Sequence, residues 1–132
     1  MHTTRLRVRG YECDAYGHVN NAVYLNYLEA ARDQLLADLE LDYSALMGAG
    51  GGIWVAEANL KYVSPALHGE ELVIRTVQEE AGAVSAVLKQ TVWGPAERLV
   101  LEARMKLVWV SGGRPARVPA DWKRTFAEGL AP

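Results

Sequence analysis

One stretch with helical periodicity is followed by four stretches with the two-residue periodicity of β-strands, an order that few architectures satisfy. Apolar side chains recur at helical spacing from Ala22 to about Leu39, which predicts a long amphipathic helix. A short, edge-like strand is predicted before it, over residues 4–12. Further strands are predicted over residues 53–62, 71–78, 84–93 and 99–109. Because the helix must bury a broad apolar face, we expect an α+β domain with the helix on one face of an antiparallel sheet.

The connections between these elements carry turn and cap signals. Asp42 is expected to start a short helical turn that ends near Met47, and the glycine-rich residues 48–52 are expected to break regular structure. No Lys followed by Ser or Thr comes after these glycines, which excludes a P-loop. Within residues 53–62, alternation places Trp54 and Ala58 on one face of the strand. Gly112, Gly113 and Pro115 end the last strand, and a helix is predicted over residues 120–128.

Length and charge exclude several classes of function. The 132 residues, half of them hydrophobic, predict a single domain over residues 1–132 with a core of its own. Fourteen basic and sixteen acidic residues give a net charge of −2 without a run of like charge, so no nucleic-acid partner is expected. Arg5, Arg7 and Arg9 alternate as one solvated face of a strand would.

Cysteine usage and hydropathy point to a cytoplasmic protein. Cys13 is the only cysteine, so it forms no intrachain disulfide, and no Cys or His pairs have the spacing of metal ligands. A thiol nucleophile is disfavoured because Asp14 is adjacent and would raise the pKa of the Cys13 thiol. No apolar stretch has the length of a signal peptide core or of a membrane span. We therefore expect no membrane span and no export.

The run from Asp14 to Arg32 gathers a carboxylate, an imidazole and two amides immediately before the long helix. The first turn of a helix has free N–H groups and a positive dipole end, so it attracts negative charge. His18, Asn20 and Asn21 lie beside this helix start, and either asparagine is a good N-cap residue. Such an arrangement can bind an oxyanion while Asp14 acts as a base or nucleophile, which is one way to hydrolyse an acyl compound.

Each of these residues also has a purely structural interpretation. Residues 14–17 match a type I turn with Asp first and Gly last, His18 can be a hydrogen-bonded, partly buried histidine, and the asparagines can be caps alone. The concentration of four polar groups in eight residues ahead of an apolar helix favours a functional site.

The same run resembles the 4-hydroxybenzoyl-CoA thioesterase-like family. The matching positions are Asp14, Gly17, His18, Val19, Asn20, Asn21, Tyr24, Tyr27, Glu29 and Arg32, with further similarity at Lys61, Tyr62, Ser64, Pro65, Ala66, Gly69 and Glu71. The resemblance implies a hotdog fold, in which a five-stranded antiparallel sheet wraps around a long central helix. It also implies a homodimer that joins its sheets edge to edge, with active sites at the interface, or a tetramer made of two such dimers.

The resemblance further implies an acyl-CoA thioesterase that releases a free acid and coenzyme A. Asp14 falls at the position of the catalytic carboxylate, as a general base or a nucleophile, and the backbone N–H near Asn21 falls where the thioester carbonyl binds. His18 and Asn20 are candidates to orient Asp14 or water. Gly17, Tyr24 and Lys61 complete the substrate-binding set, and Lys61, Arg104 and Lys106 are candidates to bind the coenzyme A phosphates. No metal or redox cofactor is implied, since coenzyme A is part of the substrate.

Several alternatives remain open at the level of sequence. Residues 18–24 also resemble plant acyl-ACP thioesterases, although Tyr16 replaces the asparagine of their catalytic network, and the choice between coenzyme A and carrier protein is open. Glu29 is a second candidate carboxylate, with an ion pair to Arg32 as its structural interpretation. A non-catalytic protein that binds acyl thioesters or an acyl carrier protein is the alternative function. A dehydratase or hydratase is disfavoured because those proteins have a different Asp and His pattern.

Overall fold

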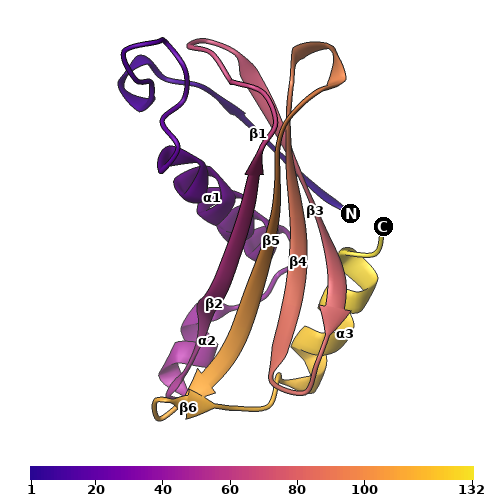
Figure 1. Cartoon of the computed structure of the whole chain (residues 1–132). Coiled ribbons are helices and arrows are strands. Elements are labelled where there is room, and N and C mark those ends of the chain that lie inside the picture. Colours follow the sequence, from indigo (N-terminus) through magenta and orange to yellow (C-terminus); the bar gives the residue numbers. More distant parts are fainter.

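The computed structural model describes all residues, 1–132, and confirms the predicted α+β architecture (Figure 1). The elements are β1 (His2–Arg7), a 3₁₀ turn (Gly10–Glu12), α1 (Val23–Asp38), α2 (Tyr43–Gly48), β2 (Gly51–Tyr62), β3 (Glu71–Ala81), β4 (Ser85–Gly94), a 3₁₀ turn (Pro95–Glu97), β5 (Arg98–Ser111), β6 (Arg114–Pro115) and α3 (Ala120–Gly129). No helix is long and apolar enough to cross a membrane.

The strands form one antiparallel sheet in the order β1-β3-β4-β5-β2, curled so that α1 lies on one face (Figure 1). A strand lies at each of the five predicted places, and a short sixth strand, β6, pairs with the end of β5. The bounds predicted for the first strand, residues 4–12, were wrong: β1 spans His2–Arg7, and Gly10–Glu12 form a 3₁₀ turn instead of continuing the strand. We expected Gly112, Gly113 and Pro115 only to end the strand. Instead Gly112 and Gly113 both have positive φ, 59° and 77°, and turn the chain back into a tight hairpin.

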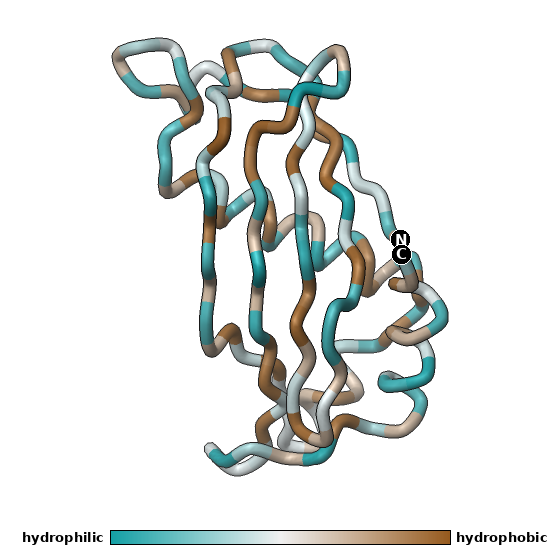
Figure 2. Tube along the Cα trace, turned by 45° about the vertical axis from the view of Figure 1, so that its right-hand side comes forward, coloured by the Kyte–Doolittle hydropathy of each residue, from teal (hydrophilic) through white to brown (hydrophobic).

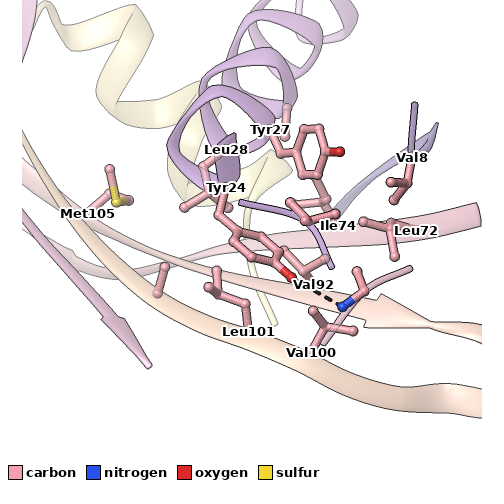
Figure 3. Close-up of a cluster of buried hydrophobic side chains, with 14 residues drawn as sticks. Val8, Tyr24, Tyr27, Leu28, Leu72, Ile74, Val92, Val100, Leu101 and Met105 are labelled. Atoms are coloured by element: carbon pink, nitrogen blue, oxygen red, sulfur yellow. Dashed lines mark hydrogen bonds between the residues drawn. The ribbon is translucent and has the colours of Figure 1, made fainter. Parts of the chain in front are cut away.

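The core lies between α1 and the sheet. Leu28, Ala31 and Leu35 are fully or almost fully buried at helical spacing, and Tyr24 and Tyr27 point from the same helix toward the strands (Figure 3). Hydrophobic and hydrophilic residues alternate along the strands, as a sheet with one covered face requires (Figure 2). A second cluster, Trp109, Trp122 and Phe126, packs α3 against the far end of the sheet.

The start of α1 differs from its prediction. The helix begins at Val23, so neither Asn20 nor Asn21 is its N-cap residue. Asn20 caps the preceding turn instead, because its Oδ1 accepts the N–H of Ala22 at 3.1 Å and its carbonyl accepts the N–H of Val23 at 2.9 Å. Asn20 therefore stabilises the turn that leads into α1, in which asparagine is favoured, and does not cap α1 itself. Asp42 does cap α2 as predicted, accepting the N–H of Ala45 at 3.1 Å.

β2 also differs from its prediction in two ways. It begins at Gly51, inside the glycine stretch expected to be irregular. A β-bulge between Val55 and Glu57 shifts the pairing with β5, so Val55 and Ala58 face the same side as α1, whereas Trp54 faces the outer side. The prediction that Trp54 and Ala58 share a face was wrong, since an inserted residue reverses the alternation.

Candidate active site

The turn at residues 14–17 holds the Asp14 carboxylate in a fixed position. The carbonyl of Asp14 accepts the N–H of Gly17 at 3.0 Å, and Gly17 has a φ of 75°, which glycine adopts without strain. One carboxylate oxygen, Oδ1, accepts the N–H groups of Tyr16 at 2.9 Å and His18 at 3.2 Å. The turn interpretation is therefore confirmed. The same contacts leave Oδ2 of an exposed carboxylate without a donor from the chain.

Backbone hydrogen bonds fix this loop against the rest of the site. The N–H of Asp14 donates to the carbonyl of His18 at 2.8 Å, and the N–H of Val19 donates to the carbonyl of Ala66 at 2.9 Å. The N–H of Asn20 donates to the carbonyl of Glu12 at 2.9 Å. The loop thus connects the start of α1 to the segment between β2 and β3.

Four of the predicted residues line a cavity of about 260 Å³ at the start of α1, namely Asp14, His18, Asn21 and Tyr24. The segment that follows β2 forms its opposite wall, through Val63, Ser64 and Pro65. Tyr62 also lines the cavity. Its hydroxyl donates to the carbonyl of Asn21 at 3.1 Å, and its ring packs against that of Tyr24 with 5.7 Å between the ring centroids.

Two backbone N–H groups at this helix start have no acceptor within the chain. They belong to Asn21 and Tyr24, whose side chains line the cavity. The Tyr24 hydroxyl is buried and accepts the N–H of Ala66 at 3.3 Å, drawn as the dashed line in Figure 3. Burial raises the pKa of this hydroxyl, so it stays neutral. Free N–H groups at the positive end of a helix dipole can stabilise an oxyanion.

The other three predicted residues do not line the cavity. Gly17 provides the turn, Asn20 uses its side chain on Ala22, and Lys61 lies on the outer face of the sheet opposite Glu102. His18 bonds to Asp14 through its backbone N–H, and its ring makes no hydrogen bond to the Asp14 carboxylate.

Sequence reasoning missed an ion pair that supports the cavity wall. Arg98 donates from Nη2 to Glu70 at 2.7 Å and to the carbonyl of Pro65 at 3.1 Å, while Glu70 also accepts the N–H of Leu67 at 2.7 Å. The Arg98 guanidinium lowers the pKa of the Glu70 carboxyl. Glu70 and Arg98 are far apart in sequence and lie outside any motif, so no local pattern signals them.

The remaining candidates have structural partners. Glu29 forms the expected ion pair with Arg32 and does not reach the Asp14 cavity. Arg32 also donates to buried Gln90 at 2.9 Å. Burial, together with the charges of Asp14 and Glu12, raises the pKa of the Cys13 thiol, which disfavours the thiolate. Arg104 is held by Glu79 and Glu102.

A curled antiparallel sheet around one central helix, with polar groups gathered at the helix start, defines a protein of the hotdog class. The chain belongs to the thioesterase-like superfamily, whose family model matches residues 8–126. The resemblance to hotdog thioesterases is thereby confirmed, and the chain is a thioester hydrolase.

Individual relatives agree with this membership. The chain is 31% identical over 128 residues to the acyl-acyl carrier protein thioesterase ATL2 of Arabidopsis thaliana, covering 96% of this chain and 68% of that protein. It is 31% identical over 108 residues to the long-chain acyl-CoA thioesterase FadM of Escherichia coli, covering 81% of each. The crystal structure of Slr0204, a 1,4-dihydroxy-2-naphthoyl-CoA thioesterase from Synechocystis, superposes with a TM-score of 0.90 at 18% identity, covering 99% of this chain and 98% of that one.

Proposed function

We propose that this protein hydrolyses acyl-CoA thioesters to a free carboxylic acid and coenzyme A, with Asp14 as the catalytic residue. The observation that carries the proposal is the pairing of a free carboxylate oxygen on Asp14 with unpartnered N–H groups of Asn21 and Tyr24 around one cavity. A thioester carbonyl bound to those N–H groups would have Asp14 on the loop beside it.

Two balanced routes use this arrangement. As a general base, Asp14 removes a proton from water while the water oxygen bonds to the carbonyl carbon, and the proton then goes to the departing thiolate. As a nucleophile, Asp14 forms a mixed anhydride and expels the thiolate, and water then hydrolyses the anhydride. In both routes the N–H groups of Asn21 and Tyr24 stabilise the oxyanion of the tetrahedral intermediate.

The other predicted residues take supporting roles in the proposal. His18 lines the cavity and is placed to orient water, and Asn20 shapes the turn that presents the free N–H groups. Tyr62 joins the site because its hydroxyl holds the carbonyl of Asn21. Lys61 is assigned to the coenzyme A phosphates, on the outer face of the sheet. Since water is the only co-reactant, the reaction needs no metal or redox cofactor.

We further propose that the protein is a homodimer joined through β2. This strand forms one edge of the sheet, and its residues 54–59 are all exposed, including Trp54 and Val55. A long exposed edge strand with apolar side chains is a template for pairing with another strand. Two such edges would pair around the twofold axis of a dimer.

The test is release of free thiol from short, medium, long and aryl acyl-CoAs by the wild type and Asp14→Asn. We expect turnover by the wild type and a loss of at least about 100-fold in the variant, because the amide is neither a base nor a nucleophile. Asp121→Asn, an exposed carboxylate change on α3, is the matched control and should keep wild-type turnover.

Each contrary result identifies another explanation. Full turnover in a folded Asp14→Asn would exclude Asp14 and point to His18 or Glu29. If the wild type cleaves acyl-ACP but no acyl-CoA, the carrier protein replaces coenzyme A in the proposal, as the name of ATL2 suggests. If thioesters raise the melting temperature but stay intact, the protein binds them without catalysis.

A further inference from the structure

Two side chains hold one peptide unit just before α1. The carbonyl of Asn21 accepts the hydroxyl of Tyr62 at 3.1 Å, and the N–H of Ala22 donates to Oδ1 of Asn20 at 3.1 Å. Both bonded backbone groups belong to the peptide unit between Asn21 and Ala22. No peptide bond in the chain is cis, so this carbonyl and this N–H point in opposite directions. Hydrogen bonds at both ends therefore keep the unit from tilting.

The preceding peptide unit, between Asn20 and Asn21, carries an N–H group that the proposed reaction uses. Its carbonyl accepts the N–H of Val23 at 2.9 Å, which leaves the N–H of Asn21 on the opposite side, without an acceptor in the chain. The two units meet at the Cα atom of Asn21, so they can change their relative orientation only by rotation there. Because hydrogen bonds hold both units, the direction of the Asn21 N–H is fixed before a substrate binds.

The regular hydrogen bonds of α1 do not reach this carbonyl. The helix begins at Val23, and Ala22, its N-cap residue, makes no side-chain cap bond. The N–H of Leu25 would bond to the Asn21 carbonyl if the helix extended one turn further back. It donates to the carbonyl of Ala22 at 3.2 Å instead. The Asn21 carbonyl therefore depends on Tyr62 for its donor.

Tyr62 is suited to hold this carbonyl because its own position is fixed. It is the last residue of β2 and pairs with Leu101 of β5. Its ring packs against that of Tyr24, which is buried between α1 and the sheet (Figure 3). A phenol has one proton to donate, and here it goes to the Asn21 carbonyl. The hydroxyl thus has no second proton with which to bind an oxyanion directly.

We propose that Tyr62 is a positioning residue of the oxyanion site, and that it acts together with Asn20 by clamping the peptide unit next to the Asn21 N–H. This inference rests on the proposed function, in which that N–H binds the thioester carbonyl. A donor that is already aimed at the developing oxyanion stabilises the transition state more than the ground state. Tyr62 therefore acts on kcat, through the direction of the Asn21 N–H.

Tyr62→Phe tests this role, because it removes the hydroxyl and keeps the ring. With the acyl-CoA that the wild type cleaves fastest, kcat should fall about 10-fold to 100-fold, while KM should change less than about twofold. Tyr11→Phe is the matched control, because Tyr11 is 82% exposed and does not line the Asp14 cavity. It should keep both constants. An unchanged kcat in Tyr62→Phe, or a loss confined to KM, would overturn the proposal.

Variants of Asn20 test whether the two side chains act on one peptide unit. Asn20→Ala removes the bond to Ala22 and should lower kcat as Tyr62→Phe does. Asn20→Ser should retain more of kcat, because a serine hydroxyl also bonds to the N–H two residues further on. When Asn20→Ala and Tyr62→Phe are combined, the loss should be smaller than the product of the two single losses. A loss equal to that product would overturn the shared role.

Hydrogen exchange separates failure of this inference from failure of the proposed function. The N–H of Ala22 is the probe, since it belongs to the clamped peptide unit. Its exchange, followed by NMR, should be about fivefold faster in Tyr62→Phe and unchanged in Tyr11→Phe, whether or not the protein cleaves thioesters. Equal exchange in Tyr62→Phe and the wild type would overturn the positioning role alone. Faster exchange in Tyr62→Phe, with no thioester cleaved by the wild type, would overturn the proposed reaction alone.

Discussion

At the scale of single residues, the ion pair between Glu70 and Arg98 joins the cavity wall to β5. Their contacts to Leu67 and Pro65 hold both parts of the loop between β2 and β3. We expect Glu70→Gln to lower the free energy of unfolding by about 1 kcal/mol at neutral pH, after allowance for the partly exposed Arg98. Urea unfolding at pH 7 measures this loss.

The pH dependence of that loss follows from the lowered pKa of Glu70. A carboxyl whose pKa is lower in the folded state stabilises the fold above its unfolded pKa of about 4.3, and this contribution disappears as pH falls through the folded value. The difference between Glu70→Gln and wild type should therefore be present at pH 7 and shrink in strong acid. Glu71→Gln, whose pair with Arg5 is exposed, should change little at either pH. An equal loss in both variants would contradict a specific role for Glu70.

The candidate site was predictable from sequence only where its residues are neighbours along the chain. Asp14, His18 and Asn21 lie within one loop, so their polar character stood out ahead of an apolar helix. Ser64 and Arg98 reach the same region through sheet pairing across long sequence separations, which no local pattern encodes.

At the scale of elements, periodicity predicted which segments are strands. It did not predict which residues of β2 face the helix. The bulge near Val55 reverses the two faces of β2, because one extra residue offsets a period of two. Leu25 belongs to the apolar stripe of α1, so its exposure was also unforeseen. It is exposed because the stripe is wider than the face of the helix that the sheet covers.

The packing of α3 gives a prediction about this element. Trp122 is buried, and its ring contacts Trp109 at 6.2 Å between centroids. We expect Trp122→Ala to lower the free energy of unfolding by about 3–5 kcal/mol, because it leaves a cavity between α3 and the sheet. Lys123→Ala, on the exposed side of the same helix, should change it by less than about 0.5 kcal/mol. Denaturant unfolding followed by tryptophan fluorescence and circular dichroism would compare the two; similar values would show that α3 is not part of the cooperative core.

At the scale of the whole molecule, strand order and closure around α1 came from the resemblance, since alternation alone does not determine which strands pair. The observed order leaves two edges, β1 and β2, and they differ in character. β1 alternates exposed arginines with half-buried residues, whereas β2 exposes Trp54 and Val55. Charges on an edge oppose pairing with another chain, and apolar residues favour it. The asymmetry supports our proposal of a dimer joined through β2.

Ala58→Glu places a charge on the exposed, helix-facing side of β2, next to Glu57. In a dimer joined through β2, twofold symmetry would bring these carboxylates of both chains together in a partly desolvated interface, which opposes association. We expect the variant to sediment as a folded monomer and to lose thioesterase turnover, because the family resemblance implies active sites at the interface of two subunits. Thr3→Glu adds the same charge to the exposed face of β1 and should leave both properties unchanged. A monomeric Ala58→Glu with full turnover would show that one chain contains a complete site, and a dimeric one would place the interface elsewhere than β2.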